Sequence, residues 1–153
     1  MVTTTNLSIV FVKLSTADPA NSLARDNVGL AEVAIGDVLI EQSQMSAAIS
    51  HVHNAIANFE SIAHKSRYQV LGQASAYDAM GRALFGFAER DLNVSQKFEH
   101  LQRSKVWFEK SLTTFREEPS LNSVDPLGGD ITEQSVRQEL SKCEEFLARL
   151  HSR

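Results

Sequence analysis

The stretch that decides the fold is GLAEVAIGDVLIEQSQMSAAISHVHNAIANFESI, which runs from Gly29 to Ile62. Its apolar residues recur every three or four positions on both sides of a polar break at Ser43-Gln44, a pattern typical of two amphipathic helices. Because so short a connection forces neighbouring helices to run antiparallel, the stretch predicts a helical hairpin. The small residues Gly36, Ala48 and Ala55 allow the two helices to approach closely.

The spacing within this stretch resembles the tetratricopeptide repeat, a helix-turn-helix unit of about 34 residues. The repeat has the pattern W-x2-L-G-x2-Y, followed by A-x3-F and a proline. Six residues of the chain fall on these positions: Glu32, Ile35, Gly36, Leu39, Ala48 and Val52. Ala55 falls on the small residue that usually follows them. The resemblance implies an all-α fold in which antiparallel helical hairpins stack as a short α-solenoid.

The first hairpin is expected over residues 20–66. Apolar residues at helical spacing predict one long helix over residues 20–42. The turn is expected at Ser43-Gln44, and Ser46 is the expected N-cap of the second helix, since a serine side chain can accept a bond from a free amide of the first turn.

A second hairpin is expected over residues 68–117. The motif returns in its first helix at Tyr77, Met80-Gly81 and Leu84, and in its second helix at Ser104, Phe108 and Ser111. Gly81 and Ser104 lie 23 residues apart, whereas Gly36 and Ala48 lie 12 apart. The 11 extra residues amount to about three helical turns. Both helices are therefore expected to be longer than in the motif, the first reaching about Asp91 and the second starting near Ser95.

The segments before and after the hairpins complete a single domain over residues 6–153. Residues 1–5 are expected to be a disordered start, and residues 6–15 to form a short apolar helix, although Ile9-Val10-Phe11-Val12 suits a strand equally well. The helix would resemble the tail of a preceding repeat. Residues 118–131 contain two prolines and Gly128-Gly129 and are expected to be a loop.

A capping helix is expected over residues 132–152. Asp130 is its expected N-cap, with Glu133 completing a capping box. An apolar stripe would seal the end of the array; it consists of Val136, Leu140, Cys143, Leu147 and Leu150.

The region from Asp18 to Leu150 also resembles the repeat region at the carboxyl end of certain bacterial serine/threonine kinases. The stretches that carry this resemblance are DPAN at 18–21, LARD at 23–26, IGDVL at 35–39, WFEKSL at 107–112 and ELSKC at 139–143. It implies the regulatory tail of a bacterial signalling kinase. The chain has no Gly-rich phosphate loop, no His-Arg-Asp and no Asp-Phe-Gly, so the family's activity does not carry over.

Composition limits the partners that can be expected. The net charge of −4 and the pI near 5.7 argue against nucleic acid, which needs a basic face. No apolar run approaches the ~20 residues that span a bilayer. There is one cysteine and no secretory signal pattern, so a cytoplasmic protein is expected.

Several residues could in principle bind a metal or phosphate or act as a nucleophile, but a structural role explains each of them more simply. His51 and His53 are two residues apart and do not share a helix face, so no metal site is expected. Cys143 lies in an apolar stripe and is expected to pack in the core. Gly81 and Gly86 lie within a helix, so they favour close helix approach over phosphate binding. No cofactor and no enzymatic activity are expected, because no convergent polar groups are evident.

The resemblance implies that a ligand lies along the concave face formed by the first helices of the hairpins. The residues expected there are Val33, Asp37, Ile40, Glu41, Asp78, Arg82, Phe85 and Glu89. A clamp for a terminal carboxylate needs Lys and Asn, and Val33 with Asp37 stand in the corresponding places. The expected function is thus a non-catalytic protein or peptide interaction module whose ligand carries apolar and basic groups.

There is one alternative to ligand binding on the concave face, and one alternative function for the whole chain. The face residues would also suit solvated charges beside a few core residues. The second functional hypothesis is a structural one, in which the chain self-associates as a homodimer through the apolar end near residues 7–14, because about three repeats are usually needed for independent stability.

Overall fold

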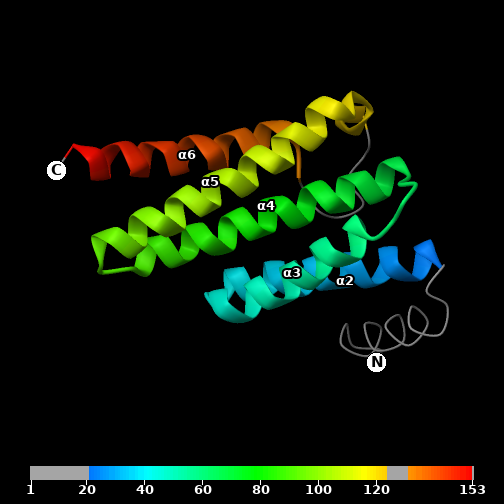
Figure 1. Cartoon of the computed structure of the whole chain (residues 1–153), viewed down its shortest axis with the longest axis horizontal. Coiled ribbons are helices and arrows are strands. Elements are labelled where there is room, and N and C mark those ends of the chain that lie inside the picture. The colour runs from blue at the N-terminus through cyan, green and yellow to red at the C-terminus, as the bar shows by residue number, and fades with distance from the viewer. Residues whose placement is uncertain (1–20, 124–130, 153) are drawn as a thin grey trace.

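The computed structural model describes residues 21–123 and 131–152, and the remaining residues lie outside this description. The described chain is all-α and contains no sheet. Its elements, labelled as in Figure 1, are α2 (Ser22–Glu41), α3 (Met45–Glu60), α4 (Arg67–Arg90), α5 (Val94–Glu117), the short 3-10 helix η1 (Pro119–Ser123) and α6 (Glu133–His151). Helices adjacent in sequence pack antiparallel, as the two predicted hairpins and the predicted last helix require.

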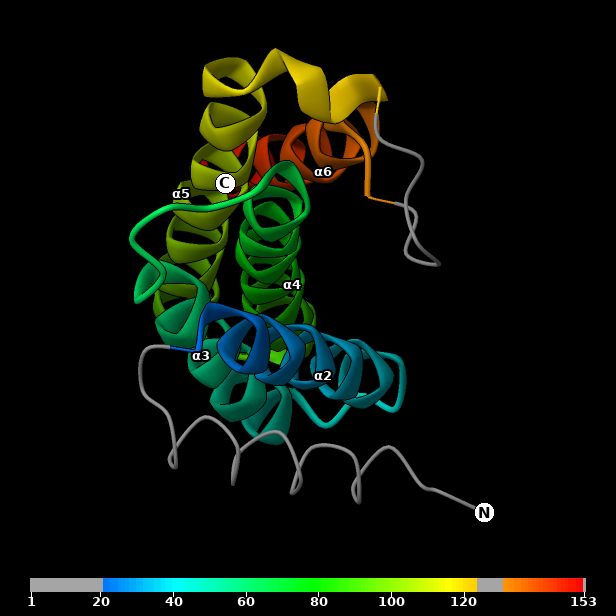
Figure 2. The ribbon, with the colours of Figure 1, turned by 90° about the vertical axis from the view of Figure 1, so that its right-hand side faces the viewer.

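The helices form two rows. In Figure 2, α2, α4 and α6 follow one another along one side, and α3 and α5 lie along the other. Contacts join α2 to α4 and α4 to α6 as well as the sequence neighbours. Among the helices described, none is both long and apolar enough to cross a membrane.

The first core lies between α2, α3 and α4 and is centred on Phe59, which is fully buried. The Phe59 ring lies between two glycines, one on each neighbouring helix. A Cβ added to Gly29 of α2 would lie 2.8 Å from the ring, and one added to Gly72 of α4 would lie 2.6 Å from it. These distances are too short for any larger residue, so the two glycines allow α2 and α4 to close around one aromatic side chain.

The second core lies between α4, α5 and α6. It is built around fully buried Leu101 and Phe108 of α5 and fully buried Val136 and Cys143 of α6. The remaining members of the predicted stripe on α6 are partly buried against the same core: Leu140, Leu147 and Leu150. The predicted apolar face of the last helix is therefore confirmed.

The long second hairpin is also confirmed. Helix α4 ends at Arg90, and Asn93 caps the start of α5 by accepting bonds from the amides of Ser95 and Gln96. The predicted loop at 118–131 is only partly correct, since η1 forms within it. Leu121 of η1 is 2% exposed and packs in the second core, which explains why this part of the segment is ordered into a turn.

The predicted N-cap at Ser46 is wrong. Helix α3 begins at Met45, with Gln44 in the cap position and no side-chain cap bond. Ser43 has a φ of 65°, a left-handed conformation that ends α2 early. The amide of Gln44 then bonds the carbonyl of Leu39 at 2.8 Å, which brings the chain into α3 sooner than predicted.

The predicted cap of the last helix is also wrong. Thr132 is the N-cap of α6, and its hydroxyl accepts a bond from the amide of Ser135 at 3.0 Å. The Ser135 hydroxyl accepts in turn from the Thr132 amide at 2.9 Å, so Ser135 and not Glu133 completes the capping box. The predictions for residues 1–5 and 6–15, and the position of Asp130, lie outside the described residues.

Candidate functional site

A groove of about 380 Å³ lies between α2, α4 and α6. Four of the residues predicted to bind a partner line it: Ile40 from α2, and Arg82, Phe85 and Glu89 from α4. The rest of its lining consists of Ser43, Met45, Gly86, Arg90, Glu139 and Lys142. Residues far apart in sequence thus meet on the side of the molecule where α2, α4 and α6 follow one another (Figure 2).

Arg82, which lines the groove, is the centre of an ion-pair network. The Arg82 guanidinium donates from Nη2 to Asp37 Oδ1 at 2.6 Å and from Nε to Asp78 Oδ2 at 2.7 Å. Since Asp37 belongs to α2 and Asp78 to α4, Arg82 ties the two hairpins together. Two of the predicted ligand-binding carboxylates are therefore already paired within the protein.

Burial and ion pairing together determine the pKa values in this network. Asp78 is 8% exposed, and its burial raises the pKa of the carboxyl, against the opposing effect of Arg82. Burial alone would lower the pKa of Arg82, but the carboxylates of Asp78 and Asp37 raise it above the usual value. Arg82 is thus charged at every physiological pH, and its charge is directed at the two carboxylates.

The groove also has an apolar patch. The Phe85 ring packs edge-on against Phe146 of α6, with ring centroids 5.2 Å apart. Ile40 is partly buried beside the first core. Gly86 leaves room for Met45, whose Cε would lie 2.3 Å from a Cβ at that position. An apolar ligand side chain would find neighbours from α2, α3 and α4 here.

The remaining predicted residues lie elsewhere. Val33 is 7% exposed and belongs to the first core, so its predicted place on the binding face is wrong. Helix α2 packs against both α3 and α4, and Val33 lies on the face that these contacts bury. Glu41 is exposed near the end of α2 but does not line the groove.

The sequence interpretation missed the contribution of α6. Glu139 and Lys142 line the groove and form an ion pair of 2.7 Å. Arg90 was also missed; its Nη1 donates to the Ser43 carbonyl at 2.5 Å and joins α4 to the end of α2. In the sequence, Glu139 and Lys142 lie three residues apart and outside the apolar stripe of the last helix. This spacing was the signal that could have indicated a polar face there.

No family model, curated protein or solved structure matches this chain. The tetratricopeptide and kinase-tail resemblances therefore stay predictions from residue spacing.

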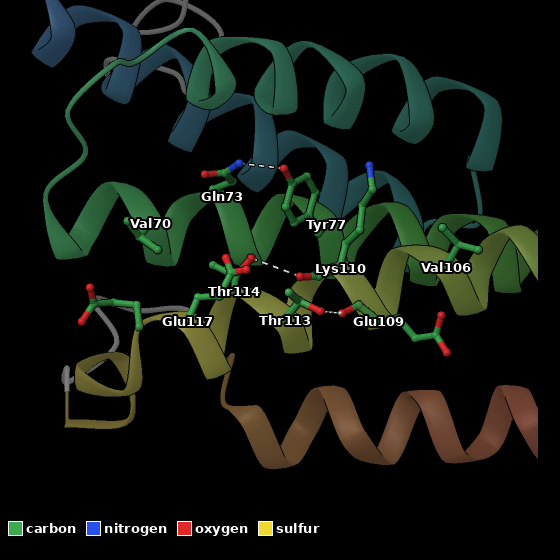
Figure 3. A pocket seen from close by; sticks show the side chains of 10 residues that line it. Val70, Gln73, Tyr77, Val106, Glu109, Lys110, Thr113, Thr114 and Glu117 are labelled. Carbon is green, nitrogen blue, oxygen red and sulfur yellow. Dashed lines mark hydrogen bonds between the residues drawn. The ribbon is translucent and has the colours of Figure 1, made fainter.

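A second cavity, of about 610 Å³, lies along α4 and α5 and is shown in Figure 3. Val70 and Tyr77 of α4 and Val106 of α5 give it apolar walls. Its charged lining residues all come from α5 and the segment just after it: Glu109, Lys110, Glu117 and Glu118. The Lys110 ammonium lies 4.2 Å from the ring centroid of Trp107, so this cation is partly engaged by an aromatic face.

Tyr77 has a structural role in this second cavity. Its hydroxyl donates to Glu60 Oε1 of α3 at 2.8 Å and accepts from Gln73 at 2.6 Å. Burial, with Glu60 adding to its effect, raises the Tyr77 pKa to about 12. The hydroxyl therefore stays protonated near neutral pH and is a poor general base, while it links α4 to α3.

The histidines and the cysteine also have structural neighbours. His51 Nδ1 lies 2.6 Å from Glu32 Oε2, whereas His53 is exposed. The described part of the chain brings together no group of three potential metal ligands. The Cys143 thiol donates to the Leu101 carbonyl at 3.2 Å, and burial raises its pKa, which disfavours the reactive thiolate.

Proposed function

We propose that this chain is a non-catalytic interaction module of tetratricopeptide-repeat type, which binds a peptide or protein segment in the groove between α2, α4 and α6. One observation carries the proposal: Ile40, Arg82, Phe85 and Glu89, chosen from the sequence motif alone, line one groove. A concave site with an apolar patch and a few placed charges is the usual form of a ligand site.

Equivalent contacts in the two hairpins support the repeat type. A Cβ on Gly36 of α2 would lie 2.5 Å from Val52 of α3, and a Cβ on Gly81 of α4 would lie 2.6 Å from Phe108 of α5. The motif assigns these glycines to one repeat position and their partners to another. Helix α6 then takes the place of the first helix of a third unit, beside α4.

The groove suggests the chemistry of its ligand. Phe85 and Ile40 favour one apolar side chain. Since Asp37 and Asp78 are paired with Arg82, a basic group of the ligand would instead meet Glu89, which is exposed at the groove. We therefore expect a short segment with an apolar and a basic residue.

A displayed library of random 12-residue peptides, selected on the immobilised full chain, tests this function. Selected peptides should combine apolar and basic residues, and their affinity should fall about tenfold for Phe85→Ala and for Glu89→Lys. Leu92→Ala is the matched control, because Leu92 is fully exposed at the turn between α4 and α5. Circular dichroism would verify that each variant is folded.

The proposal fails if no peptide is enriched, or if the selected peptides bind Phe85→Ala and Glu89→Lys as tightly as the parent chain. It also fails if Leu92→Ala weakens them equally, because binding would then not depend on the groove.

A further inference from the structure

Helix α2 carries apolar residues around its whole circumference. Ala24 and Val28 are both 4% exposed, whereas Leu23, Leu30 and Val38 are 64%, 45% and 50% exposed. A helix that is apolar all round is typical of one covered on every side. The exposed face of α2 therefore has the composition of a packing surface, but none of the described helices packs on it.

The exposed apolar residues form one line, which we call the α2 stripe and define as Leu23, Leu30, Ala34 and Val38. Their spacing of 7, 4 and 4 keeps them on one face over about 22 Å, the geometry that a second helix packs against. Asn27 falls on the same face, in the first interval of the line. Among the described residues, the other large exposed apolar side chains are Tyr68, Leu92, Val94 and Val106, none of them on α2.

Acidic groups border the α2 stripe. Helix α2 has four carboxylates and one cation, Arg25. Asp37 lies on the edge facing α4, and its side chain is 39% exposed. It pairs with Arg82, but Asp78 shares that single positive charge, so the three side chains together are net negative. Asp26 lies on the same edge, hydrogen-bonded to Gln69 of α4, and its Oδ1 is buried with no hydrogen-bond partner among the described residues. Glu41, three residues beyond Val38, is exposed.

We propose that the α2 stripe docks an amphipathic helix of a partner protein, whose apolar residues are flanked by Lys or Arg. A line of apolar residues along one helix face is suited to packing against a second helix. Carboxylates beside this line favour a helix that carries basic residues. A second copy of this chain paired through the same stripe would bring like charges together, which disfavours that occupant. The stripe is separate from the groove, because none of its residues lines the groove, so this inference goes beyond the proposed function.

The test uses two 18-residue model peptides, one of Leu and Lys arranged as an amphipathic helix and one with every Lys replaced by Glu. Titration of the isotope-labelled full chain should shift amide signals of residues 23–38 with the Leu/Lys peptide and leave them unchanged with the Leu/Glu peptide. The double variant Leu30→Gln with Val38→Gln should weaken the Leu/Lys peptide about tenfold.

Two further variants keep the outcome specific. Leu92→Gln with Val94→Gln removes a more exposed apolar pair, at the turn before α5 and at its first residue, and binding should be unchanged. Glu41→Lys changes an exposed charge and leaves the apolar line intact, so the preference for Lys over Glu in the peptide should narrow.

Several results would overturn the proposal. Shifts confined to the groove, equal shifts with both peptides, or full affinity in the Leu30→Gln/Val38→Gln variant would each exclude a basic helix on the stripe. A dimer that the same variant returns to monomer would assign the stripe to a second copy. Phe85→Ala separates this inference from the proposed function, which allows an apolar and basic peptide to enter the groove as well. The variant should remove any shifts at the groove residues and leave the shifts of residues 23–38 unchanged.

Discussion

The two hairpins bring their helices together at equivalent positions but with different chemistry. In α2–α3, a Cβ on Gly36 would lie 2.5 Å from Val52, and in α4–α5 a Cβ on Gly81 would lie 2.6 Å from Phe108. Beside these contacts Ala48 of α3 is fully buried, and so is its counterpart in α5, Ser104. The same small size is therefore reached with an apolar residue in one hairpin and a polar one in the other.

The serines of α5 are tolerated because the backbone of α4 is close. The Ser104 hydroxyl donates to the Gly81 carbonyl at 2.8 Å, and the Ser111 hydroxyl donates to the Ala74 carbonyl at 2.9 Å. A buried hydroxyl without a partner would destabilise the fold. The comparison teaches that the glycine on one helix sets how closely its partner helix approaches, and that this distance then limits which small residues the partner helix can carry.

The largest loss of stability is expected when the Phe108 ring is removed from the interface between α4 and α5. Phe108→Ala should lower the free energy of unfolding by about 3–5 kcal/mol, since a fully buried ring is lost and a cavity remains. Urea denaturation followed by circular dichroism measures this loss. Phe98→Ala is the control on the same helix; its ring is only partly buried, so a much smaller loss is expected. Equal losses would show that Phe108 does not centre the packing of α4–α5.

The next effect comes from filling the glycine positions. Gly81→Ala should destabilise the fold by about 1–3 kcal/mol, because the new methyl group meets the buried Phe108 ring. Gly36→Ala should do the same in α2–α3, where it meets the β-branched Val52.

Gly86→Ala is the control for these substitutions. Its Cβ meets the flexible end of Met45, so it should be neutral or stabilise α4 by up to about 1 kcal/mol. Thermal melts of the three alanine variants test the order. Stabilisation by Gly81→Ala would mean that the helices have room to separate there.

Sequence periodicity predicted the hairpins well, because a 3.6-residue pattern and a turn are local signals. The count of extra residues before Ser104 even predicted the long second hairpin. The caps were mispredicted, because they depend on backbone angles such as the left-handed φ of Ser43. The groove was predicted on α2 and α4 but not on α6, because Glu139 and Lys142 reach it only through tertiary packing beyond residues 118–131.

A smaller effect sharpens the contrast between Ala and Ser. Ser104→Ala converts this position of α5 to the residue found in α3, without adding volume. It should cost about 0.5–1.5 kcal/mol, the net contribution of one hydrogen bond. Ser50→Ala is the control, because its hydroxyl donates to a carbonyl of the same helix at an exposed site. Chemical denaturation of both variants compares them; a Ser104→Ala protein as stable as its parent would deny any role to the bond with Gly81.

The smallest expected effect is the pH dependence of stability that arises from the carboxylates between α2 and α4. Asp78 has Arg82 beside it, whereas Asp26 has only a hydrogen bond from Gln69, and burial raises its pKa above 3.8. A raised pKa means that the folded chain binds this proton more tightly than the unfolded chain. The resulting stability is present below pH 3.8 and is lost as the pH rises through the raised pKa.

Asp26→Asn removes this ionisation, so the variant should be more stable than the parent chain at pH 7. The difference should fade as the pH falls toward 3.8, where the parent carboxyl is protonated as well. Urea denaturation of both proteins over this pH range measures it. A difference that does not depend on pH would mean that the Asp26 carboxylate is as well solvated in the folded chain as in the unfolded one. The edge of α2 near Asp26 would then be hydrated, in contrast to Asp37 and Asp78, which are paired with Arg82.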